Sequence, residues 1–467
     1  MNFSFQMAAP QVLCYVNDNA ASIDQHWVMT TLMFLRNNTV ATSLVKRDFE
    51  EIIQSHGDVI NVRRPSNFDM DRTADNVNLN TQSAISTKIQ VPLDQWATVS
   101  FLINDGERSK SFANLVEEYL EPAAIALAQA VDRIVLGQVA RLLTYTAGEL
   151  GGMTAANAQQ FLIDTNKVLN DNAVPAAGRN LILSTNAEAK LLASSVVVEA
   201  DKRGDAGTAL RDASVGRIYN MQTWMDQNVN SVDTVDLETT GFTSGATVFA
   251  KGFAGEVTTT ATTAGQNVGE YVTIDGEGYP HEAATLSATG VTLVDPLKKA
   301  IAASVDVTFY DAQTVKTSTL AGHYDFLELT MTSGILMQVG QLLAIGTGAS
   351  REVYSVIRVS NVSATEQHVM LDRPIVSATT GASTLVFPGP AGDMNVAMHR
   401  DAVALVVRPL ATAPDGEGAK SFVASFGGLS IRMTSSYDGL AQATRITLDM
   451  LCGVQILNEK LACLLLS

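Results

Sequence analysis

The stretch KIQVPLDQWATVSFLIN, residues 88–104, has the most regular pattern in this chain of 467 residues. Apolar residues stand at odd positions and polar residues at even ones through most of it, as in a β-strand with one apolar face. As one strand it would be about 50 Å long at about 3.3 Å per residue. The apolar set is Ile89, Val91, Leu93, Ala97, Val99, Phe101 and Ile103.

The chain before this stretch, residues 66–83, is polar and rich in turn residues, with an expected tip at Asp75 to Asn80. The two segments together predict a long two-stranded hairpin. Such a hairpin is not stable alone in water unless something packs on its apolar face. A neighbouring subunit could supply that surface.

After the hairpin the pattern changes to the period of a helix. Ser111 is a plausible N-cap, and an apolar stripe then continues to about Tyr145, with Glu117 and Glu118 off the stripe. The predicted helix is about 50 Å long at about 1.5 Å per residue, with a kink expected at Pro122.

The rest of the chain divides into an α/β segment, a β-rich module and closing strands. Helices are predicted at 157–170 and 186–193, with a buried strand LILS between them at 181–184. Between about 228 and 390 the chain has short strand-like runs rich in Thr, Val, Gly and Ser, which predict a small barrel or sandwich. The breaker FPGPAG, 387–392, ends this module, and longer strands follow it.

Composition restricts the classes of function. The net charge of −17 argues against a protein that coats nucleic acid, because such binding needs clustered Lys and Arg. Charged residues make up only 17%, which leaves much of the surface neutral, as where neighbouring subunits cover it. Cys14, Cys452 and Cys463 have no metal-site spacing. The uncharged window 329–350 is interrupted by glycines, so it favours β structure over a membrane span.

Motifs that suggest catalysis are incomplete. HRD at 399–401 begins like a kinase catalytic loop, but Val406 stands where the loop needs Asn, and no glycine-rich loop occurs. HEAAT at 281–285 has Thr285 where a zinc helix needs a second His. Adjacent Glu117 and Glu118 point in different directions on a helix, so they make a poor acid/base pair. We therefore expect no catalytic, cofactor-binding or metal-binding residues, and no enzyme.

The order of these segments resembles the major capsid proteins of tailed double-stranded DNA bacteriophages with the Hong Kong 97-type fold. The resemblance covers nearly all of the chain outside the β-rich module. It rests on five stretches: VKRDFEEIIQSHGDVINVRRP (45–65), LRDASVGRIYNMQTWM (210–225), HRDAVALVVRPLATAP (399–414), SIRMTSSYDG (430–439) and TRITLDMLCGV (444–454).

The resemblance implies an α+β fold made of an arm, an extended loop, a peripheral domain with a spine helix, and an axial domain. The β-rich module resembles the inserted domain of the branch typified by a Salmonella podovirus coat protein. The HRD stretch then becomes the return from this insertion, and Asp401 is structural. The implied division is arm 1–50, extended loop and base 51–110, peripheral domain 111–150, axial domain 151–228, insertion 229–390 and return strands 391–467.

The implied function is self-assembly into pentamers and hexamers of an icosahedral head that encloses DNA without sequence-specific binding. The resemblance implies portal and scaffolding partners, no membrane partner, and a place in the virion capsid after assembly in the host cytoplasm; a decoration protein is left open. An encapsulin-like bacterial shell enclosing enzymes is the alternative. Lys88 is the only lysine of the loop and lies within a strand, so we expect non-covalent overlap to stabilise the shell. The residues expected at subunit contacts are Arg63 and Arg64, which can pair with carboxylates at the loop base, and Asp75, Asn76, Asn78, Asn80, Lys88, Glu117 and Glu118.

Overall fold

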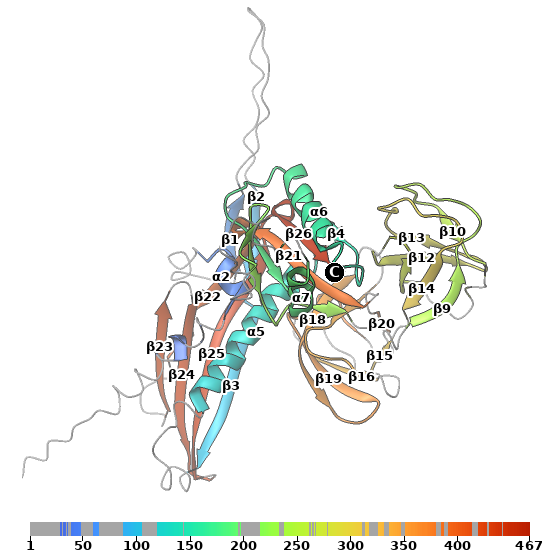
Figure 1. Cartoon of the computed structure of the whole chain (residues 1–467). Helices are drawn as coiled ribbons and strands as arrows, with labels where there is room; N and C mark the ends of the chain where they lie inside the picture. Colours follow the sequence, from blue (N-terminus) through green and yellow to red (C-terminus); the bar gives the residue numbers. More distant parts are fainter. Residues whose placement is uncertain are drawn as a thin grey trace, which may run out of the picture.

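The computed structural model shows a mixed α+β chain whose body is built from two sheets, with two further β units beside it (Figure 1). The mixture of helices and strands agrees with the predicted class. The structure describes residues 29, 31–33, 35, 39–47, 59–64, 87–104, 119–142, 144–194, 197, 215–232, 238–260, 263, 266, 268–277, 279–310, 313–316, 326–330, 336–346, 351–379, 384–386, 391–412, 419–426, 429–440 and 442–467.

The first sheet of the body, called the long sheet here, contains the strands with the most extensive pairing. β25 is at its centre and pairs with three other strands, one of them β3 along all ten of its residues. The helix α5 (Glu121–Val139) lies along one face of this sheet (Figure 1). The strands are β3 (Gln95–Asn104), β22 (Val403–Arg408), β23 (Ala419–Phe426), β24 (Leu429–Asp438) and β25 (Ala443–Ile456).

α5 confirms the predicted helix, but it ends at Val139, before the predicted end at about Tyr145. Pro122 lies in its first turn, where a missing N–H costs little. The side chains of Leu127, Val131 and Val135 are fully or almost fully buried, so the predicted stripe faces the core. The predicted start at Ser111 lies outside the described residues.

The period-two stretch does not form one strand. Its first part is β2 (Thr87–Pro92), which pairs antiparallel with β1 (Val59–Arg64), whereas its second part is β3 in the long sheet. The prediction of a hairpin is therefore confirmed at its base, but the prediction of a single strand through 89–103 was wrong. The chain changes direction at Leu93 and Asp94, which belong to neither strand.

The break coincides with Pro92, which has no N–H to donate to a ladder, and Gly453 makes room for the chain there. A β-carbon at Gly453 would collide with the carbonyl oxygen of Pro92, so the backbone of the β2–β3 connection lies directly on β25. Val91 packs there against Ala404 and Val406 of β22. The connection thus fixes the hairpin base on the long sheet.

The second sheet of the body, called the mixed sheet here, carries the predicted α/β segment. Helices α6 (Ala158–Asp171) and α7 (Thr185–Leu192) agree with the predicted ones, and Ser184 caps α7 by accepting a hydrogen bond from the backbone N–H of Ala187. The strands are β4 (Thr146–Gly148), β5 (Arg179–Leu183), β6 (Arg217–Ile218), β7 (Met221–Met225), β8 (Ser231–Val232), β21 (Gly392–His399) and β26 (Ala462–Leu466).

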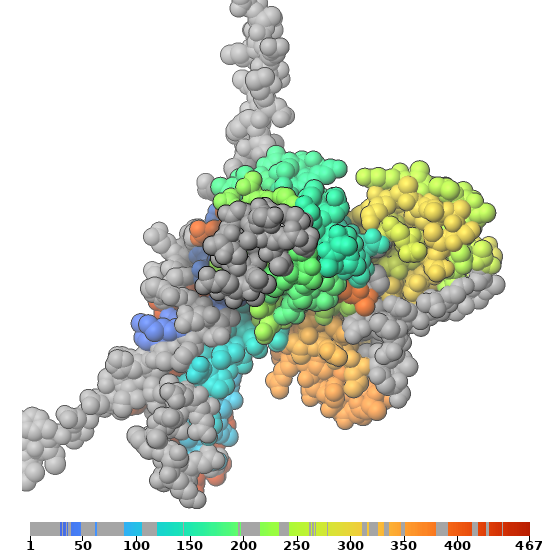
Figure 2. All heavy atoms as spheres, in the orientation of Figure 1, coloured from blue at the N-terminus to red at the C-terminus, as the bar shows by residue number. Residues whose placement is uncertain are grey.

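The β-rich interval contains two units, where the sequence suggested one. The distal sheet, 238–310, and the barrel, 313–386, each have an apolar core of their own, and they form separate lobes in Figure 2. The distal sheet contains β9 (Glu238–Thr243), β10 (Glu256–Thr258), β11 (Tyr271–Ile274), β12 (His281–Ser287), β13 (Gly290–Leu293) and β14 (Asp306–Tyr310). The closed barrel contains β15 (Gln313–Val315), β16 (Phe326–Thr330), β17 (Leu342–Ile345), β18 (Glu352–Asn361), β19 (Glu366–Leu371) and β20 (Thr384–Val386).

The contact at Gly453 predicts a large effect for a small substitution. We expect Gly453→Ala to lower the free energy of unfolding by about 1–3 kcal/mol, because backbone atoms must move to make room for the methyl group. Gly439→Ala is the matched control, since a β-carbon there meets no atom within 4 Å. Urea denaturation of both variants is the measurement, and equal stability of the two would contradict the role given to Gly453.

Candidate assembly surfaces

The hairpin base holds three of the residues expected at subunit contacts. In the β1–β2 register Arg63 lies opposite Lys88, and Arg64 lies opposite Thr87. Two basic residues at facing positions of a ladder destabilise it unless an acidic partner lies nearby. Lys88 is exposed and lies within β2, as the sequence indicated. The register therefore places three basic residues at the hairpin base of a strongly acidic chain.

The remaining contact residues cannot be placed in the same way. Asp75, Asn76, Asn78, Asn80, Glu117 and Glu118 lie outside the described residues. The structure thus brings Arg63, Arg64 and Lys88 together at the hairpin base, and their part in subunit contacts stays a prediction.

The long sheet has one covered face and one accessible face. Val99, Phe101 and Ile103 of β3 pack into the core that contains α5. Their neighbours point the other way, and Trp96 and Leu102 are 59% and 46% exposed. The polar residues of the same face pair with one another: Ser100 with Thr447 at 3.1 Å, and Arg432 with Asp449 at 2.9 Å. Val423 of β23 lies on the same face and is 37% exposed, so this face has three large apolar side chains beside its paired polar ones.

The HRD stretch is a turn that connects the two sheets of the body. His399 ends β21 in the mixed sheet, a short 3-10 turn η4 (Arg400–Ala402) follows, and β22 begins in the long sheet. The carboxylate of Asp401 lies 3.2 Å from the ammonium of Lys46, whose backbone also bonds to β22. Asp401 therefore fastens the N-terminal segment to this turn, in agreement with the structural role predicted for it.

The buried carboxylate of Asp132 holds the N-terminal segment on α5. It accepts hydrogen bonds from the backbone N–H groups of Val40 and Thr42, each at 2.8 Å, and from the Thr42 hydroxyl at 2.5 Å. The short helix α2 (Ala41–Leu44) packs there against α5. Burial, and then the nearby charge of Asp226, raise the pKa of Asp132 to about 6.

The HEAAT stretch is a strand and not a helix. His281 and Glu282 begin β12, and His281 Nε2 lies 3.1 Å from the carboxylate of Glu277.

In the part of the chain that the structure describes, no group of three or more His, Cys, Asp or Glu could hold a metal ion. No helix among the described residues is long and apolar enough to cross a membrane.

Comparison with known proteins gives structural similarity alone. No family model and no curated protein matches the chain. Of the solved structures, a Mycobacterium phage Che8 chain matches at 13% identity over 91% of this chain and 90% of that one, with a TM-score of 0.42. The capsid of Cyanophage P-SCSP1u matches at 10% identity over 91% and 87%, with a TM-score of 0.44, and the mature capsid of bacteriophage PhiM1 at 10% over 88% and 82%, with a TM-score of 0.37. TM-scores below 0.5 do not by themselves establish a shared fold.

Sequence reasoning missed Asp132 and Gly453. Asp132 lies between Val131 and Arg133 within the helical pattern, and a single acidic residue on an amphipathic helix is usually solvated. The one signal in the sequence was that Asp132 directly follows Val131, which belongs to the predicted apolar stripe. Gly453 stood within a predicted strand, where an isolated glycine signals close backbone approach.

The raised pKa of Asp132 predicts a dependence of stability on pH. A carboxyl group with a higher pKa in the folded state stabilises the fold most below its unfolded pKa, and this contribution is lost as the pH rises through about 6. We therefore expect the free energy of unfolding of the wild type, relative to Asp132→Asn, to fall by about 2 kcal/mol between pH 4 and pH 7. Denaturant titrations across this range measure it, with Asp171→Asn at the exposed end of α6 as control for the loss of one carboxylate. An identical pH slope in wild type and Asp132→Asn would refute the assignment.

Proposed function

We propose that the chain is a major capsid protein of a tailed double-stranded DNA bacteriophage, with a Hong Kong 97-type fold. In this proposal copies of the chain assemble into pentamers and hexamers of an icosahedral head. The head encloses DNA and forms in the host cytoplasm. Portal and scaffolding proteins are its proposed partners.

One observation carries this proposal: the body presents surfaces that only association can cover. α5 covers one face of the long sheet, while the other face exposes Trp96 and Leu102. The β1–β2 ladder is the second such feature, and its base packs on β22 and β25 of the long sheet. In the proposal, the exposed face and the hairpin that begins at this base form the two sides of an interface that copies of the chain can repeat.

The negative net charge of the chain agrees with a shell that encloses DNA. A net charge of −17 repels DNA, so the proposed shell encloses DNA without gripping it along its length. Many weak contacts per subunit then hold the shell, because each new contact within a closed ring forms at a high effective concentration.

The domain division belongs to the proposal as well. In it 1–50 is an arm, 51–110 the extended loop and its base, 111–150 the peripheral domain and 151–228 the axial domain. Residues 229–390 are the insertion and 391–467 the return strands. Arg63, Arg64 and Lys88 at the hairpin base, the loop residues Asp75, Asn76, Asn78 and Asn80, and the helix residues Glu117 and Glu118 are the proposed contacts between subunits.

Expression of the chain, alone and with its neighbouring genes, tests the proposal. We expect closed shells or capsomer rings by sedimentation and electron microscopy, because the hairpin and the exposed face are covered only in an assembly. A stable monomer under both conditions would refute it. Shells that contain enzymes in place of DNA-packaging partners would favour the encapsulin-like alternative.

The exposed face of the long sheet gives a sharper prediction. Trp96→Ser removes a large apolar side chain that is 59% exposed, so we expect a loss of assembly of tenfold or more with little change in the stability of the monomer. Val248→Ser on the distal sheet, where the side chain is 66% exposed, is the matched control. Sedimentation and thermal unfolding separate the two effects. Normal shells from Trp96→Ser would show that this face is not an interface.

A further inference from the structure

The barrel touches α5 at a point where no side chain fits between them. A β-carbon at Gly137 would lie 2.7 Å from the Asp372 carboxylate oxygen Oδ2 and 2.8 Å from the Asp372 β-carbon. Asp372, at the end of β19, is completely buried. Its carboxylate accepts a hydrogen bond from the backbone N–H of Ser355 at 2.9 Å and lies 2.7 Å from the guanidinium of Arg373. The helix backbone and a buried ion pair of the barrel are thus in direct contact.

A second polar connection lies beside the first. The side-chain amide of Asn230 donates a hydrogen bond to the backbone carbonyl of Leu136 in α5, at 2.9 Å. Its oxygen accepts one from the hydroxyl of Ser355 in the barrel, at 2.6 Å. Asn230 is 2% exposed, so water cannot replace these two hydrogen bonds unless the barrel separates from α5.

Ion pairs and apolar contacts extend the joint along the helix. Glu352 of β18 lies 3.0 Å from the guanidinium of Arg141, just after α5, and 3.2 Å from that of Arg373. Leu342, Ala344 and Val353 of the barrel belong to the same buried apolar cluster as α5. The outer side of the barrel therefore packs into the apolar cluster of the helix, while the inside of the barrel has its own core.

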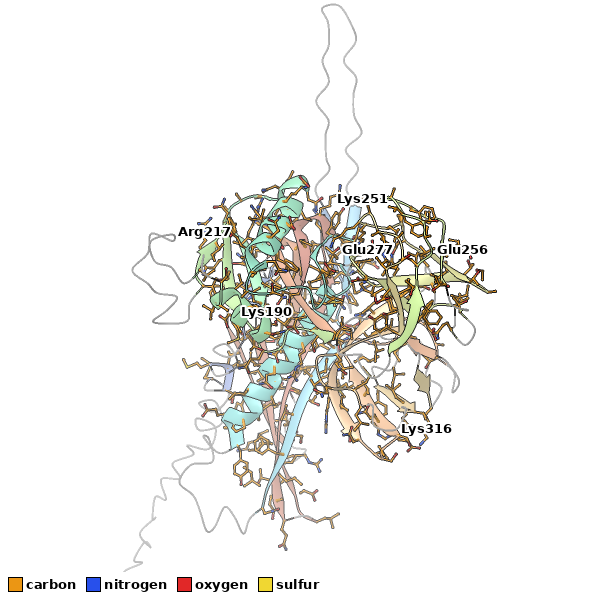
Figure 3. The ribbon with its side chains drawn as sticks, turned by 45° about the vertical axis from the view of Figure 1, so that its right-hand side comes forward. Lys190, Arg217, Lys251, Glu256, Glu277 and Lys316 are labelled. Atoms are coloured by element: carbon orange, nitrogen blue, oxygen red, sulfur yellow. The ribbon has the colours of Figure 1, made fainter. Side chains whose placement is uncertain are left out.

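The distal sheet is attached differently. Among the described residues, Lys298 lies 3.3 Å from the Thr146 hydroxyl and Lys299 lies 3.3 Å from Glu149, and Lys299 is half exposed. Toward the barrel, Glu282 of β12 lies 3.5 Å from the guanidinium of Arg351, which also lies over the ring of Tyr271. A cavity of about 1200 Å³ lies at this junction, with Lys251 and Glu277 in its lining, and Figure 3 shows both near the boundary with the body. The distal sheet contacts the main apolar cluster, which contains α5, through three buried tyrosines: Tyr271, Tyr279 and Tyr310.

We infer that the two β units of the insertion have separate roles: the barrel braces α5 against the long sheet, whereas the distal sheet is an appendage held by the barrel and the mixed sheet, which does not set the position of α5. A displaced barrel would break the hydrogen bond from Ser355 to Asn230 and the ion pair of Glu352 with Arg141, and it would expose the apolar side chains that pack against the cluster of α5. The barrel therefore stabilises the position of α5. The inference deepens the proposed function, because a shell needs a subunit whose spine helix keeps one position. Of the two measurements below, only shell formation depends on the proposed function, whereas hydrogen exchange of α5 does not.

Excision of the distal sheet tests one half of the inference. Glu238 and Tyr310 are partners in the β9–β14 ladder, and paired Cα atoms of adjacent strands lie about 5 Å apart. A short Gly-Ser linker can therefore replace residues 239–309. We expect unchanged hydrogen exchange of the α5 amides and unchanged shell formation. Exchange in α5 that becomes ten times faster would overturn the appendage role.

Substitutions at the joint test the other half. Gly137→Ala raises helix propensity, so any loosening of α5 reports the contact with Asp372 and not the helix itself. We expect the amides of 136–142 to exchange at least tenfold faster, those of the distal sheet to be unchanged, and closed shells to be lost. Asn230→Ala is the second variant, in case Gly137→Ala does not fold. Ala130→Ser, at a half-exposed position of α5, is the control.

The readouts separate the two proposals. If the wild type forms no shells, the capsid function fails, and hydrogen exchange still decides whether the barrel braces α5. If both joint variants keep wild-type exchange in α5, the brace is refuted even where shells form.

Discussion

Burial of α5 on several sides is the constraint on which the rest of the structure depends. The long sheet packs on one side of the helix, the segment around Thr42 on another, and the barrel on a third. A helix in this position needs apolar or small side chains around much of its circumference, and Ala124, Ala128 and Gly137 are buried small residues of this kind. Small residues let backbones approach closely, so α5 is a common contact for three parts of the chain.

Two buried carboxylates show how polar groups determine the way in which other segments pack against α5. Asp132 and Asp372 are both buried, one on α5 and one against it, and burial raises the pKa of each above its ordinary value. Each accepts hydrogen bonds from backbone N–H groups, which offset part of the desolvation cost of the charge. Apolar packing alone allows a helix to slide or rotate. A buried carboxylate with defined partners allows one arrangement only, at some cost in stability.

The insertion illustrates how a large addition can be tolerated. It leaves the mixed sheet after β8 and returns at β21, and these two strands are paired, so its ends lie side by side on the body. Within it each β unit has its own apolar core. The barrel nevertheless became part of the main core through β18, whereas the distal sheet stayed at the edge (Figures 1 and 2).

The sequence by itself determined the local elements. The apolar stripe of α5, the strand periods around 88–104 and 181–184, and the β-rich composition of 229–390 each predicted the right kind of element, because backbone period and side-chain burial are coupled. Tertiary structure decided that the β2–β3 connection lies on β25, since Gly453 belongs to a strand more than 300 residues later. It also decided that Asp132 is buried, that the insertion forms two units, and that Gly137 meets Asp372. These outcomes depend on contacts between segments far apart in the chain, which no local pattern contains.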